Sequence, residues 1–176
     1  MKLAYNIPGK LWWIQEFLPP LFYKDLHNAI IKQRKKINLH SARGVWLEDL
    51  ITNLEAPHRS EVENYKPFEE LKILIRHNPF FRLECKKMVT NIHSMKKGAG
   101  INWHNDQRCK YGATYYLNRR WNENWGGEFM FKYKFSHGYL PCRGNSLVIV
   151  KTPIEHKVNP VVSPIVPRLT IQIFMS

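Results

Sequence analysis

The C-terminal half of the chain is a series of short segments with strand-like patterns, and this series constrains the fold more than any other feature. Residues 88–95 and 128–133 alternate apolar and polar side chains. Residues 147–150 are a short apolar run of the kind that forms a buried strand, and residues 113–117 and 169–175 also have the composition of strands. Turns that contain glycine or asparagine separate these segments. The pattern predicts a mainly β domain with a barrel-like core.

Three side chains in this region are the ligand set of a metal site. His104 and Asp106 are two residues apart, so at an extended strand end their side chains leave the same face. His156 lies 50 residues beyond Asp106, and another strand has to bring it to the site. Two imidazoles and one carboxylate leave other metal positions open, which is typical of non-haem Fe(II). Zinc could bind the same ligands, but Arg168, a forked cation suited to a carboxylate, favours iron with an oxo-acid cosubstrate.

The order of these segments resembles the double-stranded β-helix of the 2-oxoglutarate/Fe(II)-dependent oxygenases, and especially their prolyl-hydroxylase-like group. The resemblance covers about the last half of the chain, and the ordered series is far more specific than any single motif. It implies a jelly-roll, cupin-like core supported by N-terminal α-helices. The matching segments are residues 98–106, residues 113–118 (Ala-Thr-Tyr-Tyr-Leu-Asn) with Trp121, residues 126–129 (Gly-Gly-Glu-Phe), residues 145–150, residues 156–158 and residues 168–171.

The resemblance also implies an activity. His104, Asp106 and His156 would hold Fe(II), which offers open positions to 2-oxoglutarate and O2. Conversion of 2-oxoglutarate to succinate and CO2 would drive hydroxylation of an unactivated C–H bond, with ascorbate as a supporting reductant. By family analogy alone, the expected substrate is a prolyl or other peptidyl side chain, followed by a free amino acid or a small metabolite.

Three further residues are expected to hold the cosubstrate. The resemblance implies that Arg168 binds the distal carboxylate of 2-oxoglutarate. Tyr116 and Thr170 would add hydroxyl donors to the same carboxylate. Alternation along the strand places Tyr115 on the other face, although a one-residue slip of the register would exchange the two tyrosines.

The chain departs from the family pattern at two places. Arg168 follows His156 by twelve residues, which is more than is common in relatives, and the proline-rich residues 160–167 suggest a longer turn. Many relatives also place a tyrosine in the strand before the turn, where residues 93–95 read His-Ser-Met. We interpret His93 as a strand histidine with satisfied hydrogen bonds, with a polar group on the substrate side as the alternative.

The first 81 residues are expected to form a helical support for a β-helix core in residues 82–176. Apolar positions recur at helical spacing from Pro20 to about Lys36 and again from Pro67 to Arg76. Residues 1–20 read as an entry segment to the first helix. With 176 residues, the chain is most simply a single domain.

The chain is strongly basic, with a formal net charge of +13. A field of this sign favours anionic partners, but the basic clusters are short and none is interleaved with aromatic residues. A nucleic-acid demethylase with the same iron centre is therefore an alternative, disfavoured because no second arginine follows Arg168 in the last strand. The other alternative is a basic binding protein without catalysis, which has no need for the metal ligands and Arg168 together.

Composition indicates a globular protein without a membrane span. No apolar run approaches the roughly 20 residues needed to cross a bilayer, and the N-terminus lacks a signal-peptide stretch. Cys85, Cys109 and Cys142 form neither a zinc motif nor a disulfide framework, so a reducing, cytoplasmic setting is expected. Oligomeric state and substrate stay open, and residues 41–65 and 107–111 are expected to select the substrate.

Overall fold

A computed structural model describes residues 1–33, 39–43, 46, 48–51, 55–62, 65–81, 83–163 and 165–176. Two α-helices and two short 3-10 helices are found among these residues. The helices are α1 (Pro20–Gln33), η1 (Glu48–Leu50), α2 (Lys66–Arg76) and η2 (Glu123–Trp125). The strands are β1 (Lys2–Ile7), β2 (Leu11–Gln15), β3 (His40–Ser41), β4 (His58–Glu61), β5 (Met88–Met95), β6 (Ile101–His104), β7 (Tyr111–Tyr116), β8 (Phe129–Tyr133), β9 (Ser136–Leu140), β10 (Ser146–Lys151), β11 (His156–Val158) and β12 (Arg168–Met175).

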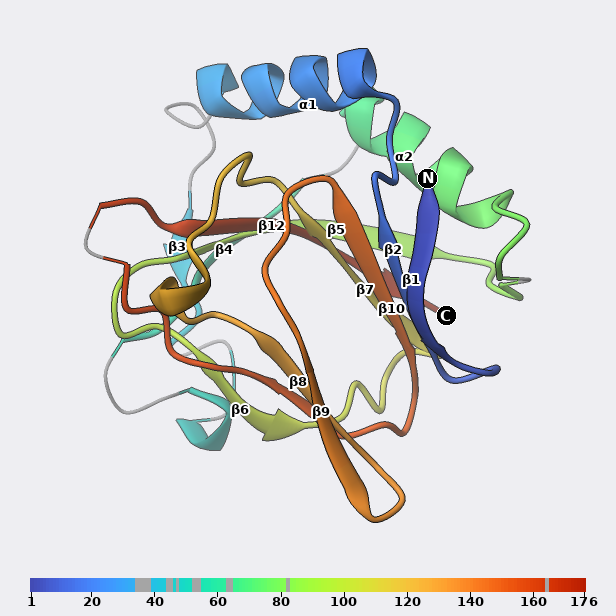
Figure 1. The fold of residues 1–176 in the computed structure, drawn as a ribbon. Coiled ribbons are helices and arrows are strands. Elements are labelled where there is room, and N and C mark those ends of the chain that lie inside the picture. Colours follow the sequence, from blue (N-terminus) through green and yellow to red (C-terminus); the bar gives the residue numbers. More distant parts are fainter. Residues whose placement is uncertain are drawn as a thin grey trace.

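Over the described ranges, the strands form a large and a small antiparallel sheet. The large sheet has the order β1-β2-β10-β7-β12-β5-β4-β3, and the small sheet has the order β6-β11-β8-β9 (Figure 1). The two sheets face one another, with an apolar cluster between them that includes Phe129, Phe131, Val148 and Val150. The prediction of a mainly β domain with flanking helices is confirmed.

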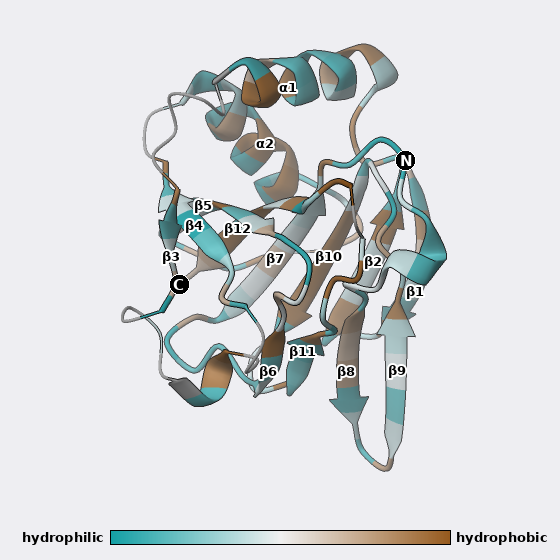
Figure 2. Ribbon diagram, turned by 90° about the vertical axis from the view of Figure 1, so that its left-hand side faces the viewer, coloured by the Kyte–Doolittle hydropathy of each residue, from teal (hydrophilic) through white to brown (hydrophobic). Residues whose placement is uncertain are grey.

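The two α-helices cover the outer face of the large sheet, on the side away from the small sheet (Figure 2). Leu26 and Ile30 of α1 are buried, at the helical spacing seen in the sequence. Phe68, Leu71 and Ile75 of α2 are buried in the same way. These side chains pack in one cluster with apolar residues of β5, β7, β10 and β12. Because the helices occupy the outer face, the inner face of the large sheet is left for the site.

The predicted helix bounds agree with the structure where it describes them. The first predicted helix ends at Gln33 in the described part of the chain, and its last predicted residues, 34–36, lie outside that part. The second begins one residue earlier than predicted, at Lys66. None of the helices that the structure describes is long and apolar enough to cross a membrane.

The N-terminal region is more than the helical support that we expected. Within the predicted entry segment of residues 1–20, residues 2–15 form the hairpin β1–β2, and β2 pairs with β10. Strands β3 and β4 extend the opposite edge of the large sheet beside β5. The apolar run from Leu11 to Ile14 is too short to distinguish a strand from another apolar segment, and its second pairing partner, β10, lies more than a hundred residues away in sequence. The division of the chain into domains stays a prediction.

Candidate metal centre

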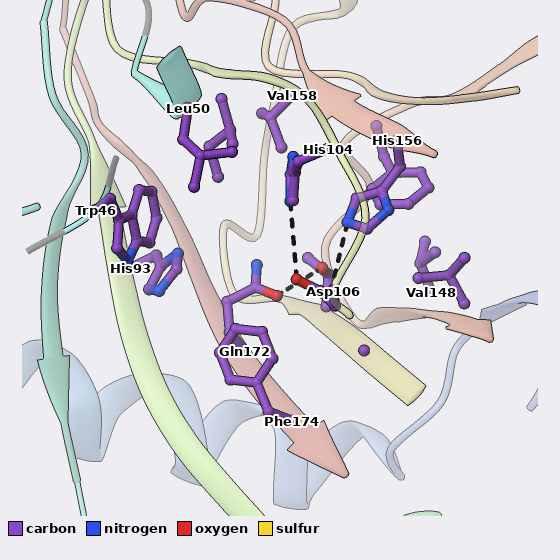
Figure 3. Close-up of a pocket in the computed structure, with 15 residues that line it drawn as sticks. Trp46, Leu50, His93, His104, Asp106, Val148, His156, Val158, Gln172 and Phe174 are labelled. Atoms are coloured by element: carbon purple, nitrogen blue, oxygen red, sulfur yellow. Dashed lines mark hydrogen bonds and ion pairs between the residues drawn. The ribbon is translucent and has the colours of Figure 1, made fainter. Parts of the chain in front are cut away.

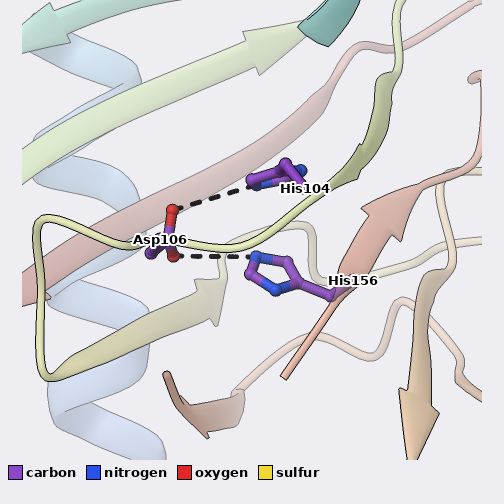
Figure 4. A group of neighbouring side chains, drawn as sticks. All are labelled: His104, Asp106 and His156. Atoms are coloured by element: carbon purple, nitrogen blue, oxygen red, sulfur yellow. Dashed lines mark ion pairs between the residues drawn. The ribbon is translucent and has the colours of Figure 1, made fainter. Parts of the chain in front are cut away.

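His104, Asp106 and His156 meet at one edge of the small sheet. His104 ends β6, Asp106 follows two residues later, and His156 begins β11. The two strands pair with His104 directly opposite His156. Asp106 Oδ1 lies 3.9 Å from His104 Nε2, and Asp106 Oδ2 lies 3.6 Å from His156 Nε2 (Figure 4). One ligand atom from each residue lies within 4.8 Å of the others, so a single metal ion could bind all three.

Hydrogen bonds to the main chain orient both imidazoles. His104 Nδ1 lies 2.7 Å from the carbonyl oxygen of Asn102, and His156 Nδ1 lies 3.0 Å from that of Ile154. A proton on each Nδ1 would be donated to these carbonyls, which leaves the Nε2 lone pairs free toward Asp106. Burial and the neighbouring His104 lower the pKa of His156, which favours its neutral, ligating form.

The main chain around Asp106 also fixes the carboxylate. The Asp106 carbonyl oxygen accepts hydrogen bonds from the Cys109 N–H (2.8 Å) and from Thr152 Oγ1 (3.1 Å). Gly112, in the neighbouring strand β7, leaves the space that the carboxylate occupies. A Cβ at residue 112 would lie 2.5 Å from Asp106 Oδ2, closer than such atoms pack. The carboxylate is therefore held against the backbone of β7.

A cavity of about 130 Å³ opens beside the three residues. In Figure 3, His104, Asp106 and His156 lie on one side of it, and Trp46 and His93 lie together on the other. Its remaining wall is mostly apolar, with Gln172 and Thr114 as polar exceptions. The lining residues are Trp46, Leu50, His93, Ile101, His104, Asp106, Gly112, Thr114, Phe129, Val148, Val150, His156, Val158, Gln172 and Phe174.

Arg168 is fully buried deeper along the same face of β12. Its Nε donates to Cys142 Sγ (3.4 Å) and one terminal nitrogen donates to Met95 Sδ (3.6 Å). Its Nη2 has no hydrogen-bond partner, and no carboxylate in the described part of the chain forms an ion pair with the guanidinium. Thiols and thioethers are weak acceptors. A buried cation with such partners is costly unless an anion joins it.

Gly127 makes room for this arginine. It has a φ of +77°, and a Cβ there would lie 2.8 Å from Arg168 Cδ. The guanidinium lies 5.0 Å from the centre of the Tyr116 ring. The Gly-Gly pair in the sequence thus has a steric reason, because the backbone must approach a large buried side chain closely.

Tyr116 and Thr170 are neighbours on the inner face of the large sheet. They are directly paired between β7 and β12, and both are buried. The Tyr116 hydroxyl has no hydrogen-bond partner, and burial raises the pKa of Tyr116, so it stays a protonated donor. Tyr115 points to the opposite side, where its hydroxyl donates to Asn145 Oδ1 (2.9 Å). The alternative register, with Tyr115 inside, is therefore excluded.

The structure places the six predicted site residues on one side of the large sheet, but in two groups. His104, Asp106 and His156 line the cavity, whereas Arg168, Tyr116 and Thr170 do not. Within the second group, Thr170 adjoins the cavity, since it lies on the same face of β12 between Arg168 and Gln172, and Gln172 lines the cavity. The roles assigned to these residues stay predictions.

The interpretation of His93 as a satisfied strand histidine is wrong. His93 is 2% exposed and lines the cavity, yet neither ring nitrogen has a hydrogen-bond partner in the described structure. Trp46 and Leu50, from the segment expected to select the substrate, line the same cavity. Alternation along β5 could have indicated this position. His93 and Met95 lie on the same face of the strand, and Met95 pairs directly with Arg168.

Comparisons with known proteins agree with this architecture. Residues 90–176 match the family model of the 2OG-Fe(II) oxygenase superfamily. A prolyl-4-hydroxylase from Pseudomonas putida is similar in structure, with a TM-score of 0.75 and 17% identity over 96% of this chain and 92% of that one. No curated protein matches the sequence.

Two other solved structures show the range of the fold. A prolyl hydroxylase from Trichoplax adhaerens, in complex with a peptide fragment of a hypoxia-inducible factor, has a TM-score of 0.76 and 14% identity over 96% of this chain and 84% of that one. A non-haem α-ketoglutarate-dependent epimerase from nogalamycin biosynthesis has a TM-score of 0.69 and 8% identity over 95% and 77% of the two chains. These likenesses confirm the predicted jelly-roll core.

The matched region begins within β5 and contains every residue of both groups. The superfamily implies Fe(II), 2-oxoglutarate and O2, and the donor set of His104, Asp106 and His156 fits such a metal. The buried, unpaired Nη2 of Arg168 fits an anionic cosubstrate. On its family model and its fold, this chain belongs to the 2OG-Fe(II) oxygenase superfamily, as a 2-oxoglutarate-dependent iron dioxygenase.

Proposed function

We propose that this enzyme hydroxylates an unactivated C–H bond in a peptidyl side chain, with prolyl as the first candidate. The observation that carries the proposal is the meeting of His104, Asp106 and His156 at the wall of a mostly apolar cavity. Iron bound there, with 2-oxoglutarate and O2, supplies the oxidising power that a C–H bond requires. The residues of the chain supply position, charge and exclusion of water.

In this proposal, the three residues bind Fe(II) through His104 Nε2, His156 Nε2 and the Asp106 carboxylate. The carbonyl groups that accept from both Nδ1 atoms keep the two lone pairs directed at the metal. His156 is also stacked on Phe129, with ring centroids 5.1 Å apart, so its plane is fixed. Three protein ligands leave positions for the cosubstrate and O2.

Arg168 is proposed to bind the distal carboxylate of 2-oxoglutarate. A guanidinium can donate two parallel hydrogen bonds to a carboxylate, and Nη2 is free to donate. The unpaired Tyr116 hydroxyl would donate to the same carboxylate, and Thr170 lies beside it on β12. Thr170 Oγ1 already accepts a hydrogen bond from Gln172 Nε2 (3.3 Å), so its proton is free to be donated. This anchor would orient the oxo-acid toward the metal.

A peptide is the proposed substrate class. Two structural neighbours are prolyl hydroxylases, and one of them is in complex with a peptide. The cavity wall is mostly apolar, which suits an aliphatic ring better than a charged free amino acid. We also propose a reducing, cytoplasmic compartment, because Cys85, Cys109 and Cys142 are all free thiols.

Succinate formation tests the metal site. Purified protein with Fe(II), ascorbate and 2-oxoglutarate is assayed alone and with a panel of proline-containing peptides, free amino acids and methylated oligonucleotides. Asp106→Ala should abolish succinate formation and Fe(II) binding without unfolding the protein. Asp25→Ala, at an exposed position of α1, is the matched control and should leave both unchanged. Retained turnover in Asp106→Ala would rule out the ligand assignment.

Replacement of Arg168 separates the anchor from a structural role. Arg168→Met keeps much of the side-chain volume and removes the buried charge. The KM for 2-oxoglutarate should rise about 100-fold, as expected for the loss of two charge-assisted hydrogen bonds. The thermal midpoint of the ligand-free protein should stay the same or rise, because an unpaired buried cation is removed. An unchanged KM would contradict the anchor.

A further inference from the structure

His93 lies on the cavity wall that faces the candidate metal centre. It is on the inner face of β5, between Arg59 of β4 and Thr170 of β12, with which it is directly paired. Figure 3 shows it beside Trp46, and their ring centroids are 5.4 Å apart. The indole therefore limits how the imidazole can turn. His93 takes part neither in the proposed metal site nor in the proposed carboxylate anchor.

Both ring nitrogens of His93 are buried and have no hydrogen-bond partner in the described structure. Buried polar groups are nearly always paired, and an unpaired one at a cavity wall calls for a ligand or an ordered water. Thr114 and Gln172, the neighbouring polar groups of the wall, are hydrogen-bonded to each other instead (2.8 Å). His93 is thus a polar residue of this wall that has free hydrogen-bonding capacity in the described part of the chain.

The charged groups near His93 limit what it can bind. Burial, with the positive charges of Arg59 and Arg168, lowers the pKa of His93 to about 3, so the ring is neutral at physiological pH. A neutral imidazole has one donor and one acceptor nitrogen. The Arg59 guanidinium is engaged with Asn91 Oδ1 (2.5 Å) and lies 4.0 Å from the Glu61 carboxylate. The two arginines disfavour a cationic ligand at this wall.

An amide matches this set of requirements. It is neutral, and it offers both an N–H that can donate to the acceptor nitrogen and a carbonyl that can accept from the donor nitrogen. Because the two ring nitrogens point away from each other in the ring plane, one amide pairs with one nitrogen, and successive amides of a peptide can pair with both. A carboxylate can only accept and an ammonium group can only donate, so each would leave one ring nitrogen unpaired. The flat amide group can also lie against the Trp46 indole.

We propose that His93 forms a substrate subsite that binds backbone amide groups of the peptide on which the enzyme acts. This inference rests on the proposed function and deepens it, because it selects a peptide unit over a free amino acid. With His93 and the metal ligands on opposite sides of one cavity, an amide held at His93 would leave the adjoining side chain directed at the metal. Trp46 and His93 would then be specificity-determining residues.

A titration of the His93 ring tests the subsite. Nitrogen-labelled protein, with Zn(II) in place of Fe(II) and with 2-oxoglutarate, is titrated with N-methylacetamide. Long-range proton–nitrogen correlation spectra follow the ring nitrogens, and His93→Leu identifies their signals. We expect a saturable shift with N-methylacetamide. Methyl acetate, which lacks the N–H, and methylammonium, which lacks an acceptor, should bind at least about fivefold more weakly.

Matched variants locate the binding. Followed at the Trp46 indole resonance, the affinity for N-methylacetamide should fall at least about fivefold in His93→Leu and be partly restored in His93→Gln, whose amide both donates and accepts. His58→Leu is the control, because His58 Nδ1 is also buried and unpaired but does not line the cavity. It should leave the affinity unchanged.

Three outcomes would overturn the subsite. The ring nitrogens could fail to respond to N-methylacetamide, which would assign the site to bound water. They could respond equally to all three probes, which would remove the amide preference. They could shift fully with 2-oxoglutarate alone, which would place His93 in the cosubstrate site. Succinate formation is measured on the same wild-type preparation. If the protein forms succinate but the ring nitrogens of His93 do not respond to N-methylacetamide, the subsite is contradicted and the proposed function is not.

Discussion

Gly112 shows how a single residue without a side chain can decide the geometry of a metal site. Its Cα faces the Asp106 carboxylate, and the nearest atom to an added Cβ would be Asp106 Oδ2 at 2.5 Å. Gly112 does not have the positive φ of Gly126 and Gly127, so the backbone itself would accept alanine. Any effect of a substitution should therefore come from the displaced carboxylate.

Gly112→Ala should weaken Fe(II) binding by about 10- to 100-fold, a typical cost of disturbing a group that positions a ligand. Calorimetric titration with Fe(II) under anaerobic conditions measures this, and circular dichroism shows whether the fold is intact. Unchanged Fe(II) affinity in a folded variant would show that Asp106 does not need the space beside β7.

His93 makes the free energy of unfolding depend on pH. Its pKa in the folded protein, about 3, is below the ordinary value of 6.5. As the pH falls, the unfolded chain therefore binds the proton first, and stability is lost from about pH 6.5 downward. From pH 7 to pH 5, the His93 contribution should cost about 2 kcal/mol. Urea denaturation of the metal-free protein should show a smaller loss for His93→Leu than for the wild type; equal losses would contradict the buried, neutral imidazole.

At the scale of elements, Asn145 joins the entry to α1 with two strands of the large sheet. Its Oδ1 accepts from the Leu18 N–H and from the Tyr115 hydroxyl, and its Nδ2 donates to the Leu18 carbonyl, each at 2.9 Å. Asn145 also has a φ of +57°, a conformation that asparagine tolerates better than most residues. The connection between α1 and the sheet therefore depends on one side chain.

Asn145→Ala should lower the free energy of unfolding by about 3 kcal/mol, roughly 1 kcal/mol for each hydrogen bond. Urea denaturation measures the change. Asn124→Ala, at an exposed position of η2, is the control and should change stability by less than about 0.5 kcal/mol. Similar small losses in both variants would show that water replaces the Asn145 contacts without cost.

The five runs predicted in the C-terminal half correspond to β5, β7, β8, β10 and β12, and each was predictable because it has its own pattern. The predicted runs at residues 147–150 and 169–175 correspond to β10 and β12 to within one residue at each end. Strands β1 to β4 were not predicted, because they are short segments with polar or aromatic residues, and in the described structure they join the rest of the sheet only through the pairing of β2 with β10 and of β4 with β5. Local pattern carries no information about such a partner.

At the scale of the whole molecule, the main core is shared between the two halves of the chain. Leu26, Phe68 and Leu71 of the helices pack in one cluster with Trp12 and Ile14 of β2 and with residues of β5, β7, β10 and β12. The region matched by the family model lies entirely on the sheet side of this cluster. That region alone would expose a large apolar surface to water.

The fragment of residues 82–176 should therefore not fold cooperatively, whereas the full chain should unfold in a single transition. Near-ultraviolet circular dichroism and the dispersion of amide proton resonances distinguish the two. A folded fragment with a sharp thermal transition would mean that residues 1–81 form a separable unit, against the prediction of a single domain.

The sequence alone determined the residues of the candidate centre and the class of fold, because both depend on local pattern. A carboxylate two residues from a histidine, a later histidine and a series of strand-like runs are visible without coordinates. Only the tertiary structure decided which side chains are left without partners. The free ring nitrogens of His93, the missing carboxylate at Arg168 and the choice of Tyr116 over Tyr115 depend on strand register and on contacts between residues distant in sequence. Whether a buried polar group has a hydrogen-bond partner depends on contacts in the folded protein, so it could not be predicted from separate segments of the sequence.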